Sequence, residues 1–259
     1  MMPVMILCGG MGTRLREETE FLPKPMVEIG GRPMLWHIMK GYAARGFTDF
    51  ILCLGYKGHK IREYFLHYEV MHCDFTIELG NKDQVEIHGR HNEAGWRVTL
   101  VETGLDSQTG ARIARALPHV KADRFMLTYG DGVADVDLTG LMRFHEQQEK
   151  IATVTGVRPS SRFGELMASG DQVTAFSEKP RMHEGLINGG FFVLDRKVSE
   201  YLSSDADCVF EREPMERLAA EGQLAVYRHN GFWQCMDTYR DYQQLQQLWM
   251  SGEAGWKTW

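Results

Sequence analysis

The sequence has no long hydrophobic run and no excess of positive charge. None of its apolar stretches approaches the roughly 18 residues of a membrane-spanning helix, and no basic segment precedes an apolar one at the N-terminus. Lys and Arg number 29 against 35 Asp and Glu, so the net charge of −6 provides no general basic surface for polyanions. We therefore expect a cytoplasmic protein that binds neither nucleic acid nor a membrane.

Cysteine is also scarce, and repeats and low-complexity linkers are absent. The five cysteines are odd in number, scattered and without a Cys-x-x-Cys pair, which argues against a disulfide framework. We expect them to be reduced and buried. The chain of 259 residues has an ordinary hydrophobic fraction of 43%, and we expect one domain over residues 1–259.

What the sequence does contain is a glycine-rich loop directly after a short apolar run. Residues 4–7 predict a buried strand, and Gly9, Gly10 and Gly12 follow it. Glycines let backbone N–H groups approach an anion closely, and Arg14 and Lys24 add positive charge suited to a polyphosphate. An ordinary turn after a strand is the alternative interpretation of the glycines alone.

Two familiar nucleotide-binding motifs do not match this loop. A P-loop ends in Gly-Lys-Ser or Gly-Lys-Thr, and the sequence contains neither triplet. The dinucleotide pattern Gly-x-Gly-x-x-Gly can start at Gly10 and Gly12, but Leu15 occupies its third glycine position. The loop therefore predicts a different class of phosphate site.

Along the chain, apolar strand patterns alternate with helical ones, which predicts an α/β fold with a mostly parallel sheet covered on both faces. Helical spacing begins after Pro33 and recurs over residues 61–68, 138–145 and 242–249, and buried strands are expected at 50–54, 125–129, 152–157, 173–176 and 191–194. Alternation over 74–103 indicates a small β-hairpin insertion at about 70–103. A C-terminal helix and a docking tail are expected at about 239–259.

The hairpin segment also gathers four histidines, His67, His72, His88 and His91, near Cys73. Their spacing matches no standard zinc pattern. Histidines that face solvent or an interface are the favoured interpretation, and a zinc site is the alternative.

Several polar residues follow predicted strands or precede predicted helices. Asp131 comes just past the strand at 125–129, where open α/β sheets bind ligands, although a turn aspartate is the alternative. Asp237 alone favours a helix N-cap before Tyr239. Asn188 suits sugar hydroxyls or a turn, and the polar loop at 107–112 precedes a helix whose N-terminus can bind phosphate.

Together, Gly9-Gly10-x-Gly12-Thr13-Arg14-Leu15 and Pro23-Lys24-Pro25-Met26 resemble the signature of the sugar-1-phosphate nucleotidyltransferases. The stretches 128–135 (TYGDGVAD), 187–194 (INGGFFVL) and 256–259 (WKTW) extend the resemblance over the whole length and are most similar to the cytidylyl branch. Many relatives that use other nucleotides carry a proline where Glu17 stands, which favours that branch further.

The resemblance implies a Rossmann-like nucleotidyltransferase fold and transfer of CMP from CTP to α-D-glucose 1-phosphate, which yields CDP-glucose and pyrophosphate. It implies that Asp131 and Asp237 hold Mg²⁺, that Arg14 and Lys24 are catalytic, and that Lys179 and Asn188 hold the sugar phosphate. The expected nucleotide-binding residues are Leu7, Cys8, Gly9, Gly10, Met11, Gly12, Thr13, Arg14, Lys24, Ser107, Arg112 and Gly130.

The family further implies a homo-oligomer whose product serves dideoxysugar synthesis for surface polysaccharide, as in lipopolysaccharide O-antigen. The choice of cytosine depends almost entirely on the resemblance. Two alternatives stay open: the same chemistry with another nucleotide or sugar 1-phosphate, and a nucleotide-sugar binding protein without turnover.

Overall fold

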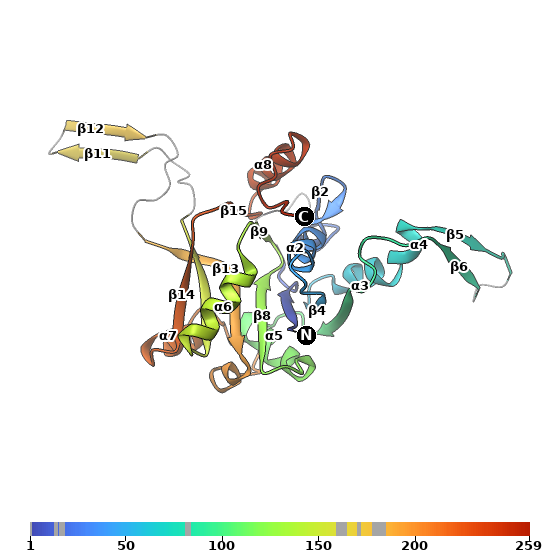
Figure 1. Ribbon diagram of the computed structural model, residues 1–259, viewed down its shortest axis with the longest axis horizontal. Coiled ribbons are helices and arrows are strands. Elements are labelled where there is room, and N and C mark those ends of the chain that lie inside the picture. The colour runs from blue at the N-terminus through green and yellow to red at the C-terminus, as the bar shows by residue number, and fades with distance from the viewer. Residues whose placement is uncertain are drawn as a thin grey trace.

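A seven-stranded sheet forms the centre of the protein, which is seen here as a computed structural model (Figure 1). The structure describes residues 2–12, 15, 19–80, 84–158, 165–169, 172–177 and 185–259. Neighbouring strands run parallel except at β13, which is antiparallel to β8 and β10. In spatial order the strands are β14 (Leu224–His229), β10 (Ala152–Val157), β13 (Ile187–Asp195), β8 (Arg124–Tyr129), β1 (Val4–Leu7), β4 (Asp49–Leu54) and β7 (Arg97–Glu102).

Helices cover both faces of this sheet, as the alternation of strands and helices predicts. The main helices are α2 (Met34–Ala43), α3 (Gly58–Leu66), α5 (Thr109–Ala116), α6 (Leu138–Gln148), α7 (Glu213–Ala220) and α8 (Tyr239–Met250). The predicted mixed, mostly parallel α/β fold is confirmed.

Strand β1 shows why its four residues are all apolar. Successive side chains of a strand point to opposite faces, so Val4 and Ile6 enter a core with α2, α6 and α8, whereas Met5 and Leu7 enter a core with α5 and α7. All four are buried. A strand that is covered on both faces needs a continuous apolar run rather than alternation.

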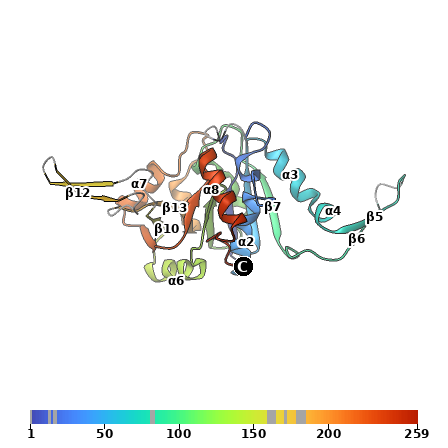
Figure 2. The same cartoon turned by 90° about the horizontal axis from the view of Figure 1, so that it is seen from above.

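Short elements complete the fold. They are η1 (Lys24–Met26), β2 (Glu28–Ile29), β3 (Arg32–Pro33), α4 (Tyr68–His72), β5 (Asp74–Ile77), β6 (Val85–His88), η2 (Leu117–His119), β9 (Gly132–Ala134), β11 (Glu165–Ser169), β12 (Gln172–Ser177), η3 (Arg196–Tyr201) and β15 (Trp233–Cys235). The β5–β6 and β11–β12 hairpins project from opposite ends of the molecule (Figures 1 and 2).

The structure corrects two expectations about strands. The hairpin β5–β6 ends at His88, and residues 97–102, which we expected inside the insertion, form β7 at the edge of the main sheet, parallel to β4. The expected strand at 173–176 lies in β12, which pairs only with β11 outside the main sheet in the described part of the chain. Alternation alone cannot tell an edge strand from a hairpin strand, because both expose one face.

The C-terminal segment after α8 packs back on the N-terminal half of the chain. Trp256 is buried, and the rings of Trp249, Trp256 and Trp259 surround the buried His37 of α2. Among the residues that the structure describes, no helix is long and apolar enough to cross a membrane.

Candidate functional site

A cleft lies at the carboxyl ends of β1 and β8, two parallel strands in which Leu7 pairs with Tyr129. The cleft has a volume of about 290 Å³ and is lined by Leu7, Cys8, Gly9, Gly10, Gly12, Lys24, Pro25, Ser107, Gln108, Thr109, Arg112, Tyr129, Gly130, Asp131 and Asp237. The glycine loop and the aspartate that follows β8 therefore meet at one edge of the sheet. This is the position at which open α/β sheets bind their ligands.

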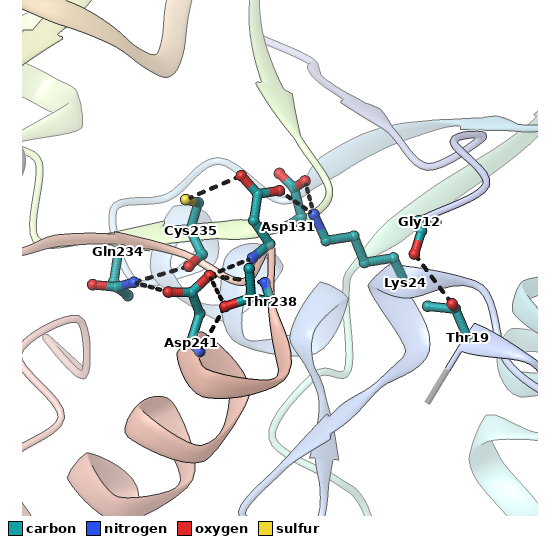
Figure 3. A network of polar contacts seen from close by, with 9 residues as sticks. Gly12, Thr19, Lys24, Asp131, Gln234, Cys235, Thr238 and Asp241 are labelled. Carbon is teal, nitrogen blue, oxygen red and sulfur yellow. Dashed lines mark hydrogen bonds and ion pairs between the residues drawn. The ribbon is translucent and has the colours of Figure 1, made fainter. Parts of the chain in front are cut away.

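The Lys24 ammonium joins two carboxylates in this cleft (Figure 3). Its Nζ lies 2.6 Å from Oδ2 of Asp131 and 2.7 Å from Oδ1 of Asp237. Burial favours a neutral amine, but the charge of Asp131 and the hydrogen bonds that Lys24 donates to both aspartates outweigh burial and raise the pKa of Lys24. Residues more than 100 positions apart thus present two carboxylates to one cation.

Asp237 can take this role because its neighbour Thr238 caps the following helix. Thr238, not Asp237, is the N-cap of α8, and it forms a capping box with Asp241. Oδ2 of Asp241 also accepts the backbone N–H of Asp237 at 3.1 Å. The interpretation of Asp237 as the N-cap is therefore wrong, and Asp241 fixes the backbone from which Asp237 reaches Lys24.

Arg112 is buried beneath the glycine loop, where it binds main-chain carbonyls. Nη2 donates to the carbonyl of Gly9 at 3.0 Å, and Nη1 donates to the carbonyls of Leu54 and Gly104 at 3.0 and 2.8 Å. A Cβ on Gly9 would lie 2.1 Å from Nη1 of Arg112. Arg112 therefore supports the loop from below, and a glycine is needed where the guanidinium passes.

The segment before α5 is held by the loop at residues 204–211. The backbone N–H groups of Gln108 and Ala111 donate to the carbonyls of Ala206 and Cys208. Two of the amides at this helix N-terminus, which we expected to face phosphate, therefore have backbone partners. Ser107 lines the cleft, and its Oγ accepts a hydrogen bond from Arg115.

A hydrogen-bonded chain of side chains borders the same cleft. Thr109 Oγ1 and Tyr129 Oη each donate to Glu211 at 2.5 Å, and Asn188 Nδ2 donates to Tyr129 Oη at 3.1 Å. Sequence reasoning missed both Tyr129 and Glu211. Tyr129 was interpreted only as the end of a buried strand, and Glu211 carries no local signal because it belongs to an ordinary polar loop.

Most of the predicted site residues lie in this cleft. Leu7, Cys8, Gly9, Gly10, Gly12, Lys24, Ser107, Arg112, Gly130, Asp131 and Asp237 all line the cleft. Met11 is exposed and does not line the cleft. Asn188 does not line the cleft either, but its side chain donates a hydrogen bond to Tyr129, which does. Thr13, Arg14 and Lys179 lie outside the described residues, as does Glu17.

The four histidines do not form a metal centre. His67 and His72 bind backbone carbonyls one turn before them, His88 contacts Thr76, and His91 contacts Glu69. Within the described ranges, no group of three or more His, Cys, Asp or Glu side chains is arranged to hold a metal ion. The zinc alternative has no support there.

Comparison with known proteins gives a family match and close relatives. The sequence profile of the family described as Nucleotidyl transferase matches residues 3–250. Glucose-1-phosphate cytidylyltransferase from Salmonella typhi is 49% identical over 259 residues, which is the full length of both chains. A probable glucose-1-phosphate cytidylyltransferase from Bacillus subtilis is 46% identical over 258 residues, again 100% of each chain.

Solved structures share the fold at lower identity. HddC from Yersinia pseudotuberculosis has a TM-score of 0.71 at 23% identity, and the match covers 96% of this chain and 100% of that one. A putative glucose-1-phosphate thymidylyltransferase from Bacillus anthracis has a TM-score of 0.70 at 20% identity, with 96% and 95% of the two chains covered. At these identities the likeness concerns the fold alone.

Proposed function

The chain belongs to the nucleotidyl transferase family, and on this basis we propose that it transfers CMP from CTP to α-D-glucose 1-phosphate. The products are CDP-glucose and pyrophosphate. The similarity to glucose-1-phosphate cytidylyltransferases extends over the full length of both chains.

The observation that supports this chemistry best is the convergence of Asp131 and Asp237 on the Lys24 ammonium. Two carboxylates that neutralise one cation also fit Mg²⁺, which takes one or two carboxylates and fills its other positions with water and phosphate oxygens. Mg²⁺ would be held by Asp131 and Asp237, and it would neutralise charge on the phosphate oxygens of CTP.

The chain's own residues supply positioning and charge. The glycine loop, supported by Arg112, presents backbone N–H groups to the triphosphate. Lys24, once released from the two aspartates, stabilises the charge that develops on the pyrophosphate leaving group, and we assign the same role to Arg14. Lys179 offsets repulsion between the two anionic substrates, and Asn188 binds a sugar hydroxyl.

The test is pyrophosphate release from glucose 1-phosphate and Mg²⁺ with CTP, UTP, dTTP, ATP or GTP at equal concentrations. We expect a strong preference for CTP. Faster release with another nucleotide would contradict the base assignment and keep the reaction. Tight CTP binding without release would instead support the binding protein without turnover.

The metal assignment has its own test. Asp131→Asn and Asp237→Asn should each lower Mg²⁺-dependent turnover by about a hundredfold or more, because each removes one charged metal ligand. Both variants should keep the wild-type circular dichroism spectrum. Wild-type turnover in either variant would remove that residue from the metal site.

We also propose that the protein assembles with copies of itself in the cytoplasm, and that its product serves dideoxysugar synthesis for surface polysaccharide. The arm that runs from α3 to β6, Gly58 to His88, supports assembly, because its Leu66, Met71 and Leu79 side chains are 77%, 74% and 90% exposed. Light scattering should report a multimer. A monomer at micromolar concentration would contradict the assembly.

A further inference from the structure

The Glu211 carboxylate connects two elements that border the cleft. It accepts the hydroxyl of Thr109 at the start of α5 through Oε2 and the phenol of Tyr129 at the end of β8 through Oε1, each at 2.5 Å. Such lengths are typical of hydrogen bonds to a charged carboxylate. Both donors line the cleft, whereas Glu211 does not. Glu211 therefore fixes the start of α5 and the end of β8 relative to each other from outside the cleft.

The phenol of Tyr129 in turn fixes the side chain of Asn188. The Asn188 Nδ2 group donates to Tyr129 Oη at 3.1 Å, while its Oδ1 accepts the backbone N–H of Gly190 at 2.9 Å. Gly190 has a φ of +80°, and a Cβ there would lie 2.6 Å from the Tyr129 ring. The start of β13 is therefore shaped to let the tyrosine ring reach the exposed Asn188.

A purely structural role explains this arrangement poorly. A negative charge beside a cleft for two anionic substrates repels them, and Glu211 has no ion-pair partner in the described part of the chain. The Tyr129 hydroxyl donates to Glu211 and accepts from Asn188, so both of its hydrogen-bonding roles are occupied by these two side chains. In the part of the chain that the structure describes, two hydroxyl donors hold the carboxylate in place.

We propose that Glu211 and Tyr129 are positioning residues that orient the Asn188 amide toward the sugar phosphate. The inference rests on the proposed function, in which Asn188 contacts a sugar hydroxyl. Glu211 acts on Tyr129, Tyr129 acts on Asn188, and neither needs to touch the substrate. The bond to Thr109 keeps the start of α5 at a fixed distance from this sugar-binding side.

The test compares Tyr129→Phe with Tyr201→Phe. Tyr201 Oη donates to Glu221 at 2.5 Å, so the control removes a similar tyrosine–glutamate bond outside the cleft. In Tyr129→Phe, loss of the bond that holds Asn188 should raise the KM for glucose 1-phosphate about tenfold and change kcat by less than about threefold. Tyr201→Phe should change thermal stability and leave this KM at the wild-type value.

A double-mutant cycle with Asn188→Ala shows whether Tyr129 acts through Asn188. The double variant should be no worse than Asn188→Ala, and Glu211→Gln, which keeps one acceptor oxygen, should be milder than Glu211→Ala. A wild-type KM in Tyr129→Phe, or additive effects in the cycle, would overturn the inference.

The experiment separates this failure from failure of the proposed function. A wild-type protein without pyrophosphate release contradicts the proposed function, and calorimetry of glucose 1-phosphate binding then replaces KM in the same comparison. Unchanged affinity in Tyr129→Phe would overturn the positioning role there too, whereas weaker binding with a normal Tyr201→Phe control would support it.

Discussion

Among single residues, Lys24 lies where it would compete with a metal ion for two carboxylates. Its ammonium contacts Asp131 and Asp237, the carboxylates that we assign to Mg²⁺. A divalent cation must therefore displace Lys24, and the released ammonium can then move to a phosphate oxygen. On this proposal, one lysine balances the charge of the two carboxylates before the metal binds and contacts phosphate afterwards.

The exchange predicts that Lys24→Met binds metal more tightly than the wild type while losing turnover. Without the competing ammonium, the affinity of the nucleotide-free protein for Mn²⁺ should rise about tenfold, measured by electron paramagnetic resonance. Lys40→Met is the matched control, because Lys40 is similarly buried and pairs with Glu93 elsewhere. Unchanged or weaker Mn²⁺ binding in Lys24→Met would show that Lys24 does not occupy the metal position.

Two neighbouring glycines should respond differently to alanine. In Gly9→Ala the new Cβ would meet Nη1 of Arg112 at 2.1 Å, whereas a Cβ on Gly10 has no atom within 4 Å. Gly9→Ala should cost about 1–3 kcal/mol of unfolding free energy and weaken CTP binding, because the guanidinium must move from its carbonyls. Gly10→Ala should unfold like the wild type in denaturant. Equal stability of the two variants would contradict the supporting role of Arg112.

Among the elements, helix α8 begins just after Asp237, one of the two proposed metal ligands. Asp241 closes the capping box and accepts the N–H of Asp237, so the helix start and the site share one side chain. In contrast, Asp137 caps α6 by accepting from Gly140 and has no such neighbour in the cleft. Variants at Asp241 and Asp137 can therefore distinguish a loss of helix stability from a change in the geometry of the site.

We predict that Asp241→Ala, which removes the capping-box partner of Thr238, and Asp137→Ala, which removes the N-cap of α6, each cost about 1 kcal/mol of stability. Only Asp241→Ala should raise the Mg²⁺ concentration for half-maximal turnover several-fold, because the backbone of Asp237 loses its anchor. Denaturant unfolding and metal titration measure the two effects. A similar metal requirement in both variants would argue against this coupling.

In the molecule as a whole, the C-terminal tail closes over a neutral histidine. His37 Nε2 lies 2.8 Å from the carbonyl of Ile29, and His37 Nδ1 lies 3.4 Å from the indole nitrogen of Trp256. A neutral ring satisfies both contacts by donating from Nε2 and accepting at Nδ1. Burial lowers the pKa of His37 from 6.5 to about 4.

The lowered pKa predicts a loss of stability in acid. The unfolded chain takes up the proton first, so the stabilisation is complete above about pH 6.5 and decreases as pH falls toward 4, by roughly 2–3 kcal/mol. In His37→Gln this part of the pH dependence should disappear from denaturant unfolding curves. His67→Gln, at an exposed position, should keep the wild-type slope. An unchanged slope in His37→Gln would place the acid sensitivity elsewhere.

The fold class and most of the residues that line the cleft can be predicted from the sequence. Strand β1 and helix α2 are evident locally, because a strand buried on both faces is continuously apolar and an amphipathic helix repeats every three to four residues. The glycine loop and Lys24 lie within about twenty residues of each other, and the parallel arrangement of β1 and β8 brings Asp131 to the same edge.

The contacts between distant side chains are evident only in the folded chain. Asp237 could be an N-cap until Thr238 was seen to cap α8, and no local pattern predicts the bond from Arg112 to the carbonyl of Gly9. Glu211 and Tyr129 are joined across 82 positions. Such contacts depend on how strands and loops are brought together in space, and no local pattern of residues records that arrangement.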